Sequence, residues 1–188
     1  MVRHAPTAAT RSFTFPGDEA IDDRGRAAAA ALSDVLPSGY DVLCSPARRC
    51  LETAACAGLA QPAVDDDLAE CDFGSWTGRA LATLTEEQPD AVRAWMTEPG
   101  AAPHGGESLT AFAARIARWL DAQATRDGGA IAITHGGVVK AAVVHALGAP
   151  LEAFWRVDVA PLGITELHAH NGRWTLTRTN SRSLAAAA

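Results

Sequence analysis

The chain has 188 residues, which is enough for one domain with a sizeable buried core. Its formal net charge of −6 argues against nucleic acid as the main partner, because binding to a phosphate backbone requires a basic face. A small phosphorylated ligand needs only a few local cations and remains compatible with this charge. The sequence contains no long apolar run and no leader-like N-terminus, so we expect no membrane span, no membrane partner and a cytoplasmic location.

The N-terminal stretch predicts a short strand that ends in charged groups. Two apolar residues lead into Arg3 and His4, and Pro6 ends the extended run. A polar stretch over residues 8–18 follows and predicts a loop. Two aromatic residues in it, Phe13 and Phe15, either contact a substrate or cover the core, and the sequence leaves both alternatives open.

Two later stretches repeat this pattern of a short apolar strand followed by polar residues. Residues 40–44 run into Ser45 and Pro46, and residues 130–134 run into His135 and two glycines. Ser is a favoured N-cap and Pro a favoured first helical residue, so we expect a helix to begin at Ser45 and continue to about residue 58. Because the carboxyl ends of parallel strands converge on one crevice, the polar residues after all three strands are expected to meet there.

The other predicted elements complete an α/β domain. We expect helices over residues 23–36, capped by Asp22 or Asp23, over 79–96 with a break near Pro89, over 108–120 and over 136–147. The helix after Ser108 shows the clearest 3.6-residue periodicity, which marks its aromatic residues as core. Alternating residues on both sides of an Asn-Gly turn predict a hairpin over 164–170 and 173–179.

The cysteines and the remaining histidines receive structural interpretations. The four cysteines follow neither a CxxC nor a zinc-finger spacing, so we expect reduced and mostly buried thiols, with no metal site. His168 and His170 share a strand face without a third ligand and are interpreted as exposed. His104 and His145 receive the same interpretation.

Basic residues at the strand ends predict a site for an anion, and phosphate in particular. Arg3 and His4 come at the end of the N-terminal strand, and His135 follows the strand over residues 130–134. Arg48 and Arg49 lie in the first turn of the helix that follows the strand over residues 40–44. Free backbone N–H groups in that turn already favour an anion. The pattern does not decide between the two adjacent arginines, since surface solvation explains either one alone.

Five short motifs in order resemble the histidine phosphatase superfamily, the phosphoglycerate-mutase-like proteins. The motifs are Arg3-His4-Ala5, the stretch 45–54 (SPARRCLETA), the Glu70-containing stretch 68–78, Gly105-Gly106-Glu107-Ser108 and Thr134-His135-Gly136-Gly137-Val138. The resemblance implies a three-layer α/β/α sandwich with a mostly parallel central sheet and a C-terminal hairpin. It also implies one domain over residues 1–183, and we expect residues 184–188 to form a disordered tail.

The resemblance implies a role for each candidate site residue. His4 is expected to be the nucleophile, Glu70 the general acid and then base, and Arg3, Arg49 and His135 the clamp on the transferring phosphoryl group. Thr10 and Gly136 are expected to contact the substrate. Arg49, rather than Arg48, falls on the family's position. No metal or cofactor is required.

The chemistry suits these residue types. A neutral imidazole can attack phosphorus and form a covalent intermediate that water later hydrolyses. Arginine forks match phosphoryl oxygens bidentately, and a carboxyl group can protonate the leaving alkoxide.

The sequence departs from the family pattern at three positions near the nucleophile. Ala5 replaces the usual Gly, Pro6 removes an N–H group, and Thr10 stands where the mutase branch has an Asn that touches phosphate. These departures motivate one alternative, a weakly active phospholigand-binding protein.

The predicted function is that of a metal-independent, acid-type phosphatase. We expect hydrolysis of a small phosphorylated metabolite through a phosphohistidine. The stretch 70–78 looks most like the branch that includes α-ribazole phosphatase, so α-ribazole 5′-phosphate is one candidate substrate. A cofactor-dependent phosphoglycerate mutase is the second alternative, although the chain lacks the long insertion of those mutases. A monomer or a homodimer is expected.

Overall fold

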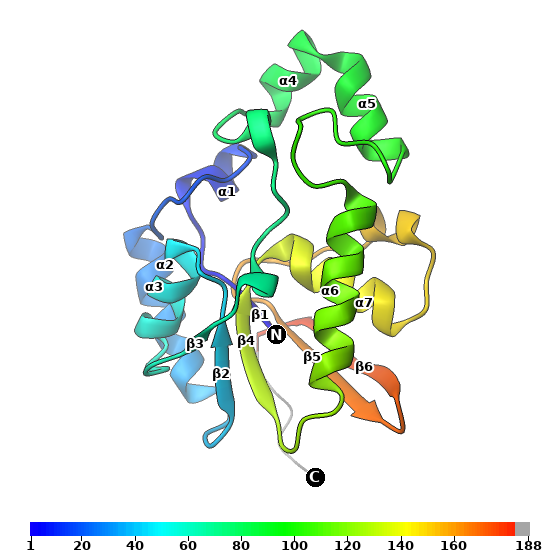
Figure 1. The fold of residues 1–188 in the computed structure, drawn as a ribbon. Helices are drawn as coiled ribbons and strands as arrows, with labels where there is room; N and C mark the ends of the chain where they lie inside the picture. The colour runs from blue at the N-terminus through cyan, green and yellow to red at the C-terminus, as the bar shows by residue number, and fades with distance from the viewer. Residues whose placement is uncertain (183–188) are drawn as a thin grey trace.

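The computed structural model describes residues 1–182, and the expected tail over residues 184–188 lies outside the described residues. Six strands form one sheet in the order β3-β2-β4-β1-β5-β6 (Figure 1). Their bounds are β1 Val2–Arg3, β2 Asp41–Cys44, β3 Ala63–Val64, β4 Ala130–Thr134, β5 Ile164–His170 and β6 Arg173–Ser181. The pairs β3-β2, β2-β4 and β4-β1 are parallel, whereas β5 runs antiparallel to both β1 and β6.

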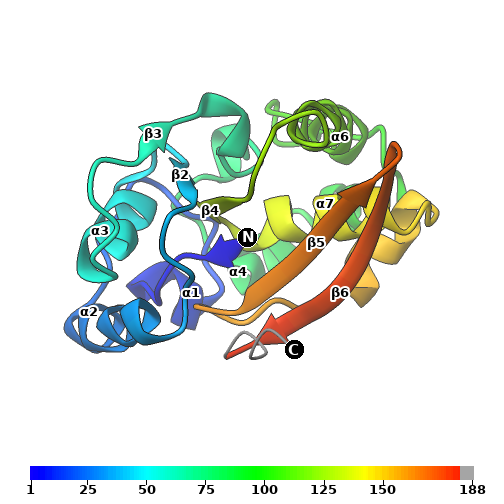
Figure 2. The ribbon, with the colours of Figure 1, turned by 90° about the horizontal axis from the view of Figure 1, so that it is seen from below.

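Helices cover both faces of this sheet. The α-helices are α1 Ala8–Ser12, α2 Asp23–Ala30, α3 Arg48–Cys56, α4 Leu81–Glu87, α5 Pro89–Thr97, α6 Leu109–Gln123 and α7 Gly136–Ala146. Short 3₁₀ helices are η1 Ala31–Asp34, η2 Asp66–Leu68, η3 Gly74–Trp76 and η4 Leu151–Arg156. Viewed from below, α2 and α3 lie on one side of the sheet and α6 and α7 on the other (Figure 2). The predicted three-layer α/β/α sandwich with a C-terminal hairpin is therefore confirmed.

The alternation of side chains along the central strand explains the two cores. Ile131 and Ile133 of β4 pack in the cluster that includes α2 and α3, whereas Ala132 between them packs with α6 and α7. Successive side chains of a strand point to opposite faces, so a short apolar strand covered on both faces has apolar residues throughout. The central strand is thus buried from Ile131 to Thr134.

Local sequence signals set several helix ends as predicted. The Asp22 side chain caps α2 by accepting a hydrogen bond from the Gly25 N–H at 2.7 Å. Ser108 caps α6 through the Ala111 N–H at 3.2 Å. Pro89 separates α4 from α5.

Three expectations were wrong in detail, and some short elements were not predicted. The stretch 8–18 contains the helix α1, which Thr7 and Thr10 cap through their side chains. Helix α3 begins at Arg48 rather than at Ser45, because the backbone stays extended as far as its N-cap residue Ala47, and the Ser45 hydroxyl lies 2.7 Å from His135. Strand β3 and helix η4 were not predicted. His104 is buried rather than exposed, with 2% of its surface accessible.

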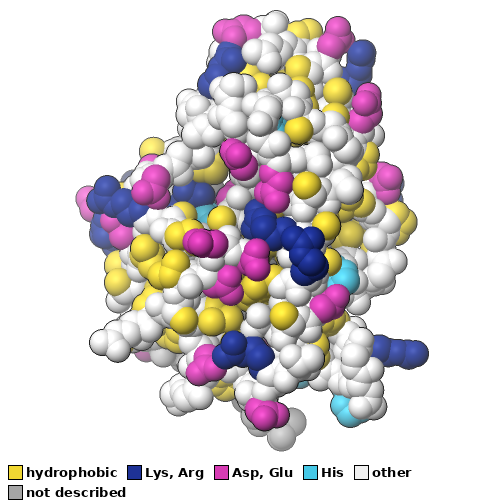
Figure 3. Space-filling view, viewed as in Figure 1, with side chains coloured by type: hydrophobic (Ala, Val, Ile, Leu, Met, Phe, Trp, Pro, Cys, Tyr) yellow, Lys and Arg dark blue, Asp and Glu magenta, His cyan; other side chains and the backbone are white. Residues whose placement is uncertain are grey.

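All four cysteines are free thiols, but only Cys44 and Cys50 are buried, whereas Cys56 and Cys71 are partly exposed. In the part of the chain that the structure describes, no group of three or more His, Cys, Asp or Glu residues is placed to hold a metal ion. No helix within residues 1–182 is both long and apolar enough to cross a membrane. On the face in Figure 3, basic side chains lie among acidic ones.

Candidate active site

The strand register brings three distant parts of the chain together. Arg3 of β1 pairs with Thr134 of β4, and the His4 N–H donates to the Thr134 carbonyl at 2.8 Å. On the other side of β4, the Ser45 N–H donates to the Ile133 carbonyl at 3.0 Å. His4 and Ser45 therefore lie on either side of the end of β4, where His135 follows.

The His4 ring is held as one tautomer. Its Nδ1 lies 2.7 Å from the carbonyl oxygen of Ala5. A carbonyl can only accept a hydrogen bond, so Nδ1 carries the proton and Nε2 keeps a lone pair. Burial and the nearby charges of Arg49 and Arg3 lower the pKa of His4 to about 3. At neutral pH the ring is an uncharged imidazole with one basic nitrogen.

Thr53 fixes the peptide that sets this tautomer. The Ala5 N–H donates to the Thr53 hydroxyl at 2.9 Å, and that hydroxyl donates to the Arg49 carbonyl at 2.6 Å. Ala5 is thus held through both its N–H and its carbonyl group.

His135 lies beside His4 and is fully buried. The two ring centroids are 5.3 Å apart, with an interplanar angle of 65°. His135 Nε2 lies 2.7 Å from the Ser45 hydroxyl, and Nδ1 lies 3.0 Å from the Arg49 guanidinium. A guanidinium only donates, so Nδ1 accepts and Nε2 donates to Ser45. Burial, with Arg49 and His4 close by, holds the pKa of His135 well below its ordinary value.

Two guanidinium groups supply the positive charge. Arg49 is only 3% exposed and also donates to the Gly17 carbonyl at 2.6 Å. Arg3 donates to the Val159 carbonyl. Burial lowers the pKa of its guanidinium, but arginine starts so high that the group stays cationic. The Nε atoms of Arg3 and Arg49 are buried without a hydrogen-bond partner among the described residues. Such donors are satisfied by an oxyanion that reaches them.

Glu70 lies at the N-terminus of α7. Its carboxylate accepts hydrogen bonds from the Cys71 N–H at 3.1 Å and from the Gly137 N–H at 3.2 Å. A Cβ atom on Gly137 would lie 2.2 Å from Glu70 Oε1, so only glycine leaves room for the carboxylate there. An added Cβ on Gly136 would lie 3.3 Å from Arg3 Nε, a tight contact that a small shift of the side chain relieves.

The segment that carries Glu70 is held from two sides. Thr134 donates to the Leu68 carbonyl at 2.7 Å. Arg115 of α6 donates to the carbonyls of Asp67 at 2.7 Å and Ala69 at 3.1 Å. Arg115 is itself fixed by a bidentate ion pair with Glu107, at 3.1 and 2.8 Å. The Gly-Gly-Glu-Ser motif thus contacts the site through an arginine that motif reasoning missed.

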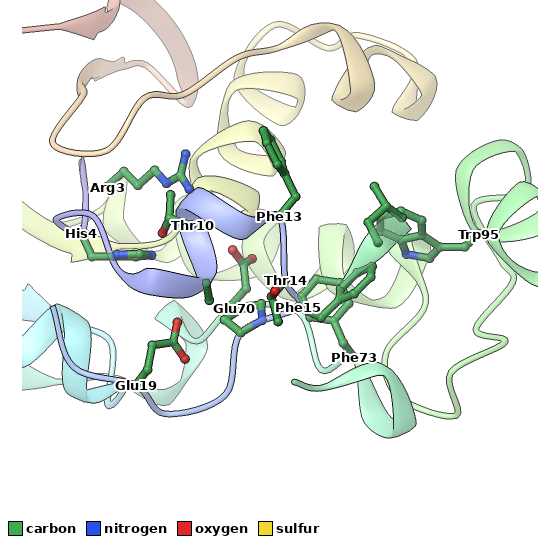
Figure 4. Close-up of a pocket in the computed structure, with 13 residues that line it drawn as sticks. Arg3, His4, Thr10, Phe13, Thr14, Phe15, Glu19, Glu70, Phe73 and Trp95 are labelled. Atoms are coloured by element: carbon green, nitrogen blue, oxygen red, sulfur yellow. The ribbon is translucent and has the colours of Figure 1, made fainter. Parts of the chain in front are cut away.

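A pocket opens in front of these groups. Figure 4 shows Arg3 and His4 at one end, Phe73 and Trp95 at the other, and Glu70 between them. The lining residues are Arg3, His4, Ala9, Thr10, Phe13, Thr14, Phe15, Pro16, Glu19, Glu70, Phe73, Leu81 and Trp95. Arg49 and His135 are not among these lining residues, and both are almost fully buried, with the His135 ring beside that of His4.

The predicted site residues are therefore brought together, but at two depths. Arg3, His4, Thr10 and Glu70 line the pocket. The Thr10 hydroxyl lies 3.0 Å from that of Thr7 in the cap of α1. Arg48 is exposed and pairs with Glu52, whereas its neighbour Arg49 is buried in the site.

Ser45, Thr53 and Arg115 were missed as site residues. Polar side chains that bond to other site residues rather than to a substrate leave no separate signal in one sequence. Ser45 in particular gave a helix-capping signal instead.

Comparison with known proteins gives a consistent assignment. Residues 1–182 match the family model described as the histidine phosphatase superfamily, branch 1. The glucosyl-3-phosphoglycerate phosphatase of Mycolicibacterium vanbaalenii is 32% identical over 168 residues, covering 81% of this chain and 75% of that protein. The bifunctional protein Rv2228c of Mycobacterium tuberculosis is 31% identical over 181 residues, and this match covers 90% of the chain but only 50% of Rv2228c. The chain thus spans about half the length of that relative.

A solved structure agrees over nearly the whole chain. The crystal structure of "a putative alpha-ribazole-5'-P phosphatase" from Escherichia coli superposes with a TM-score of 0.87 and 26% identity, covering 99% of this chain and 97% of that one. The resemblance noted in the motifs therefore extends to the family model, the sequence relatives and the fold. This chain belongs to branch 1 of the histidine phosphatase superfamily.

Proposed function

We propose that the protein is a phosphomonoesterase that hydrolyses a small phosphorylated metabolite through a phosphohistidine at His4. The observation that carries the proposal is the hydrogen bond from His4 Nδ1 to the Ala5 carbonyl, which leaves Nε2 unprotonated in a pocket beside Arg3. The phosphatase names of the relatives support the same class of reaction.

The first step forms the covalent intermediate. The lone pair of His4 Nε2 attacks phosphorus, the bond from phosphorus to the leaving oxygen breaks, and the protonated Glu70 carboxyl gives its proton to that oxygen. The alcohol then leaves. Because charge gathers on the equatorial oxygens, the main task of the protein is positioning and charge stabilisation.

The second step returns the enzyme to its starting state. The Glu70 carboxylate removes a proton from water as the water oxygen attacks phosphorus, and the bond from phosphorus to His4 Nε2 breaks. Inorganic phosphate leaves, Glu70 is protonated again, and His4 is neutral.

Arg3, Arg49 and His135 form the proposed clamp. Arg3 lines the pocket and needs no rearrangement. Arg49 has a free Nε donor, and its other donors exchange the Gly17 carbonyl and His135 Nδ1 for phosphoryl oxygens as the anion enters. His135 Nδ1 then takes the proton of the entering phosphate monoester monoanion and donates it in a hydrogen bond to a phosphoryl oxygen, and this proton leaves with inorganic phosphate, while Ser45 continues to hold Nε2.

Steady-state hydrolysis of p-nitrophenyl phosphate and of a metabolite panel in EDTA tests the proposal. The panel includes α-ribazole 5′-phosphate, and 3-phosphoglycerate with and without 2,3-bisphosphoglycerate. We expect phosphate release without metal. Interconversion of 3- and 2-phosphoglycerate in place of hydrolysis would identify a mutase, and phosphate binding without turnover would identify a phospholigand-binding protein.

A further inference from the structure

The pocket has a second end that the proposed chemistry does not use. Phe15, Phe73 and Trp95 pack edge-on or tilted against one another, with ring centroids 4.7 to 6.4 Å apart. This aromatic wall belongs to the small core under α4 and α5. Trp76 and Leu84 of that core are fully buried, whereas Phe73 and Trp95 are only half-buried and open onto the pocket.

Phe13 also lines the pocket, apart from Phe73 and Trp95 and between them and Arg3 (Figure 4). Its side chain is 78% exposed, more than any other large hydrophobic residue of residues 1–182. Its backbone is left-handed, with φ of 51°, a conformation that is unfavourable for a bulky residue. The Phe13 carbonyl accepts from the Leu81 N–H at 3.0 Å, so the backbone is tied to the start of α4. The left-handed conformation is that of the C-cap residue that ends α1, so a large exposed ring is presented at the pocket from a fixed backbone.

The charges around the pocket disfavour a second anionic group on the substrate. Arg3, at the phosphoryl end, is the only lysine or arginine among the described residues that line it. Glu19 adds a carboxylate to the wall, and it accepts a hydrogen bond from Thr7. Lys140 does not line the pocket, and its ammonium lies 5.3 Å from the centre of the Phe154 ring. A carboxylate on the leaving alcohol would lose its hydration in the pocket and would find no cationic side chain there to pair with, so its binding would cost free energy.

Resting on the function proposed above, we infer that the preferred substrates are phosphate monoesters of alcohols that carry an uncharged aromatic or apolar group. The phosphoryl group lies against His4 and Arg3, the leaving oxygen meets Glu70, and the apolar group packs on Phe13, Phe73 and Trp95. The arrangement in Figure 4 gives this order along the pocket. Phosphate monoesters of hydroxy acids and phosphorylated amino acids are disfavoured.

Three alkyl phosphates with similar leaving groups test the inference. They are propyl phosphate, 3-phenylpropyl phosphate and 3-carboxypropyl phosphate, so that differences in kcat/KM report contacts beyond the leaving oxygen. We expect the phenyl compound to exceed propyl phosphate by about tenfold, from burial of apolar surface, and the carboxylate compound to fall below it. Equal values for all three, or a preference for the carboxylate, would overturn the inference.

Binding separates this inference from the proposed chemistry. The phosphonate analogues of the phenyl and carboxylate compounds cannot be hydrolysed, and calorimetry measures their affinities whether or not the protein turns over any ester. Tighter binding of the phenyl analogue supports the substrate class even if hydrolysis fails. Equal or weaker binding of that analogue contradicts it even if hydrolysis succeeds.

Two variants assign the effect to Phe13. Phe13→Asn removes the aromatic ring and introduces a residue that tolerates the left-handed conformation. It should reduce the ratio of the kcat/KM for 3-phenylpropyl phosphate to that for propyl phosphate by about threefold or more. Leu147→Asn removes another exposed hydrophobic residue, at the end of α7, and should leave the ratio unchanged. A ratio that Phe13→Asn does not alter would exclude Phe13 from the substrate contact.

Discussion

The Ser45 hydroxyl lies 2.7 Å from Nε2 of His135, and both residues are fully buried. The Arg49 guanidinium fixes the tautomer of His135, because Nδ1 faces it and can only accept there, so Nε2 carries the proton and donates to Ser45. Ser45 also accepts from the Ala47 N–H at 3.3 Å. A residue whose pattern is typical of a helix cap thus orients the second histidine of the site.

Ser45→Ala should therefore lower both stability and activity. It leaves the buried Nε2–H of His135 with only the weak acceptor Cys50 Sγ at 3.6 Å, and the loss of the hydroxyl should cost about 1 kcal/mol or more in the free energy of unfolding. We expect kcat to fall as well, because the orientation of His135 is lost. Urea unfolding and steady-state kinetics measure the two effects. Ser33→Ala is the control, since its hydroxyl is exposed and bonds only locally. Wild-type stability and kcat in Ser45→Ala would contradict this role.

Gly137→Ala should displace the proposed general acid. The added Cβ would lie 2.2 Å from Glu70 Oε1, so the carboxylate must leave the N-terminus of α7. Hydrolysis of alkyl phosphates, which need a proton on the leaving oxygen, should fall by about 10²-fold or more. Hydrolysis of p-nitrophenyl phosphate should fall less, because p-nitrophenolate leaves without a proton.

Gly100→Ala provides the matched control for that substitution. An added Cβ at Gly100 meets no atom within 4 Å, and its backbone is not left-handed. Both substrates should be hydrolysed at wild-type rates. Equal losses for the two substrates in Gly137→Ala would argue against Glu70 as the acid.

Arg115→Met should also reduce the hydrolysis of alkyl phosphates more than that of p-nitrophenyl phosphate, but by a smaller factor than Gly137→Ala. Arg115 touches carbonyls next to Glu70 but does not line the pocket, so it acts by positioning. We expect alkyl phosphates to lose about tenfold in kcat, with a smaller loss for p-nitrophenyl phosphate. Combined with Glu70→Gln, it should add little, because both changes remove the same function.

An exposed arginine controls for loss of charge. Arg93→Met removes a cation that pairs with Asp90 on the surface, and should change neither rate. Full additivity of Arg115→Met and Glu70→Gln would show that Arg115 acts on something other than Glu70.

The neutral state of His4 predicts a pH dependence of stability. In the unfolded chain His4 binds a proton below about pH 6.5, whereas the folded protein resists protonation until a pKa of about 3. Protonation therefore favours the unfolded state. The contribution of neutral His4 to the free energy of unfolding is complete above pH 6.5 and is lost as the pH falls towards 3. Between pH 7 and pH 5, the free energy of unfolding should fall by about 2 kcal/mol from this group. His135 acts in the same direction.

Urea unfolding of wild type and His4→Asn at pH 5, 6 and 7 measures this contribution. The variant should lose less stability on acidification than the wild type does. The same dependence on pH in both proteins would show that His4 titrates normally in the folded chain.

Much of the fold and part of the site could be predicted because they depend on local patterns. The apolar strand over 130–134 and the glycines after His135 predict a buried strand and a ligand-facing helix start. Strand β3 could not be predicted, since Ala63 and Val64 form only two pairs at a sheet edge and are both exposed. Helix α1 is five residues long and closes its cap with Thr10, where Glu or Gln is usual.

The residues around the site were harder to predict because their roles depend on contacts between distant segments. Arg48 and Arg49 are equivalent in sequence, and only packing buries one of them. His104 is buried because its ring packs on Trp76 with centroids 5.2 Å apart, a contact between its loop and the short helix η3. Its position in a loop gave the opposite expectation. The single-domain prediction, the cytoplasmic location and the oligomeric state stay predictions.

The central claim is that phosphorus becomes bonded to His4. Rapid acid-free quenching of a reaction with ³²P-labelled substrate, followed by digestion and mass spectrometry, tests it directly. We predict an acid-labile phosphate on the N-terminal peptide at His4, which disappears in His4→Asn and persists longer in Glu70→Gln. Label on a different residue, or turnover by His4→Asn at the wild-type rate, would contradict the account.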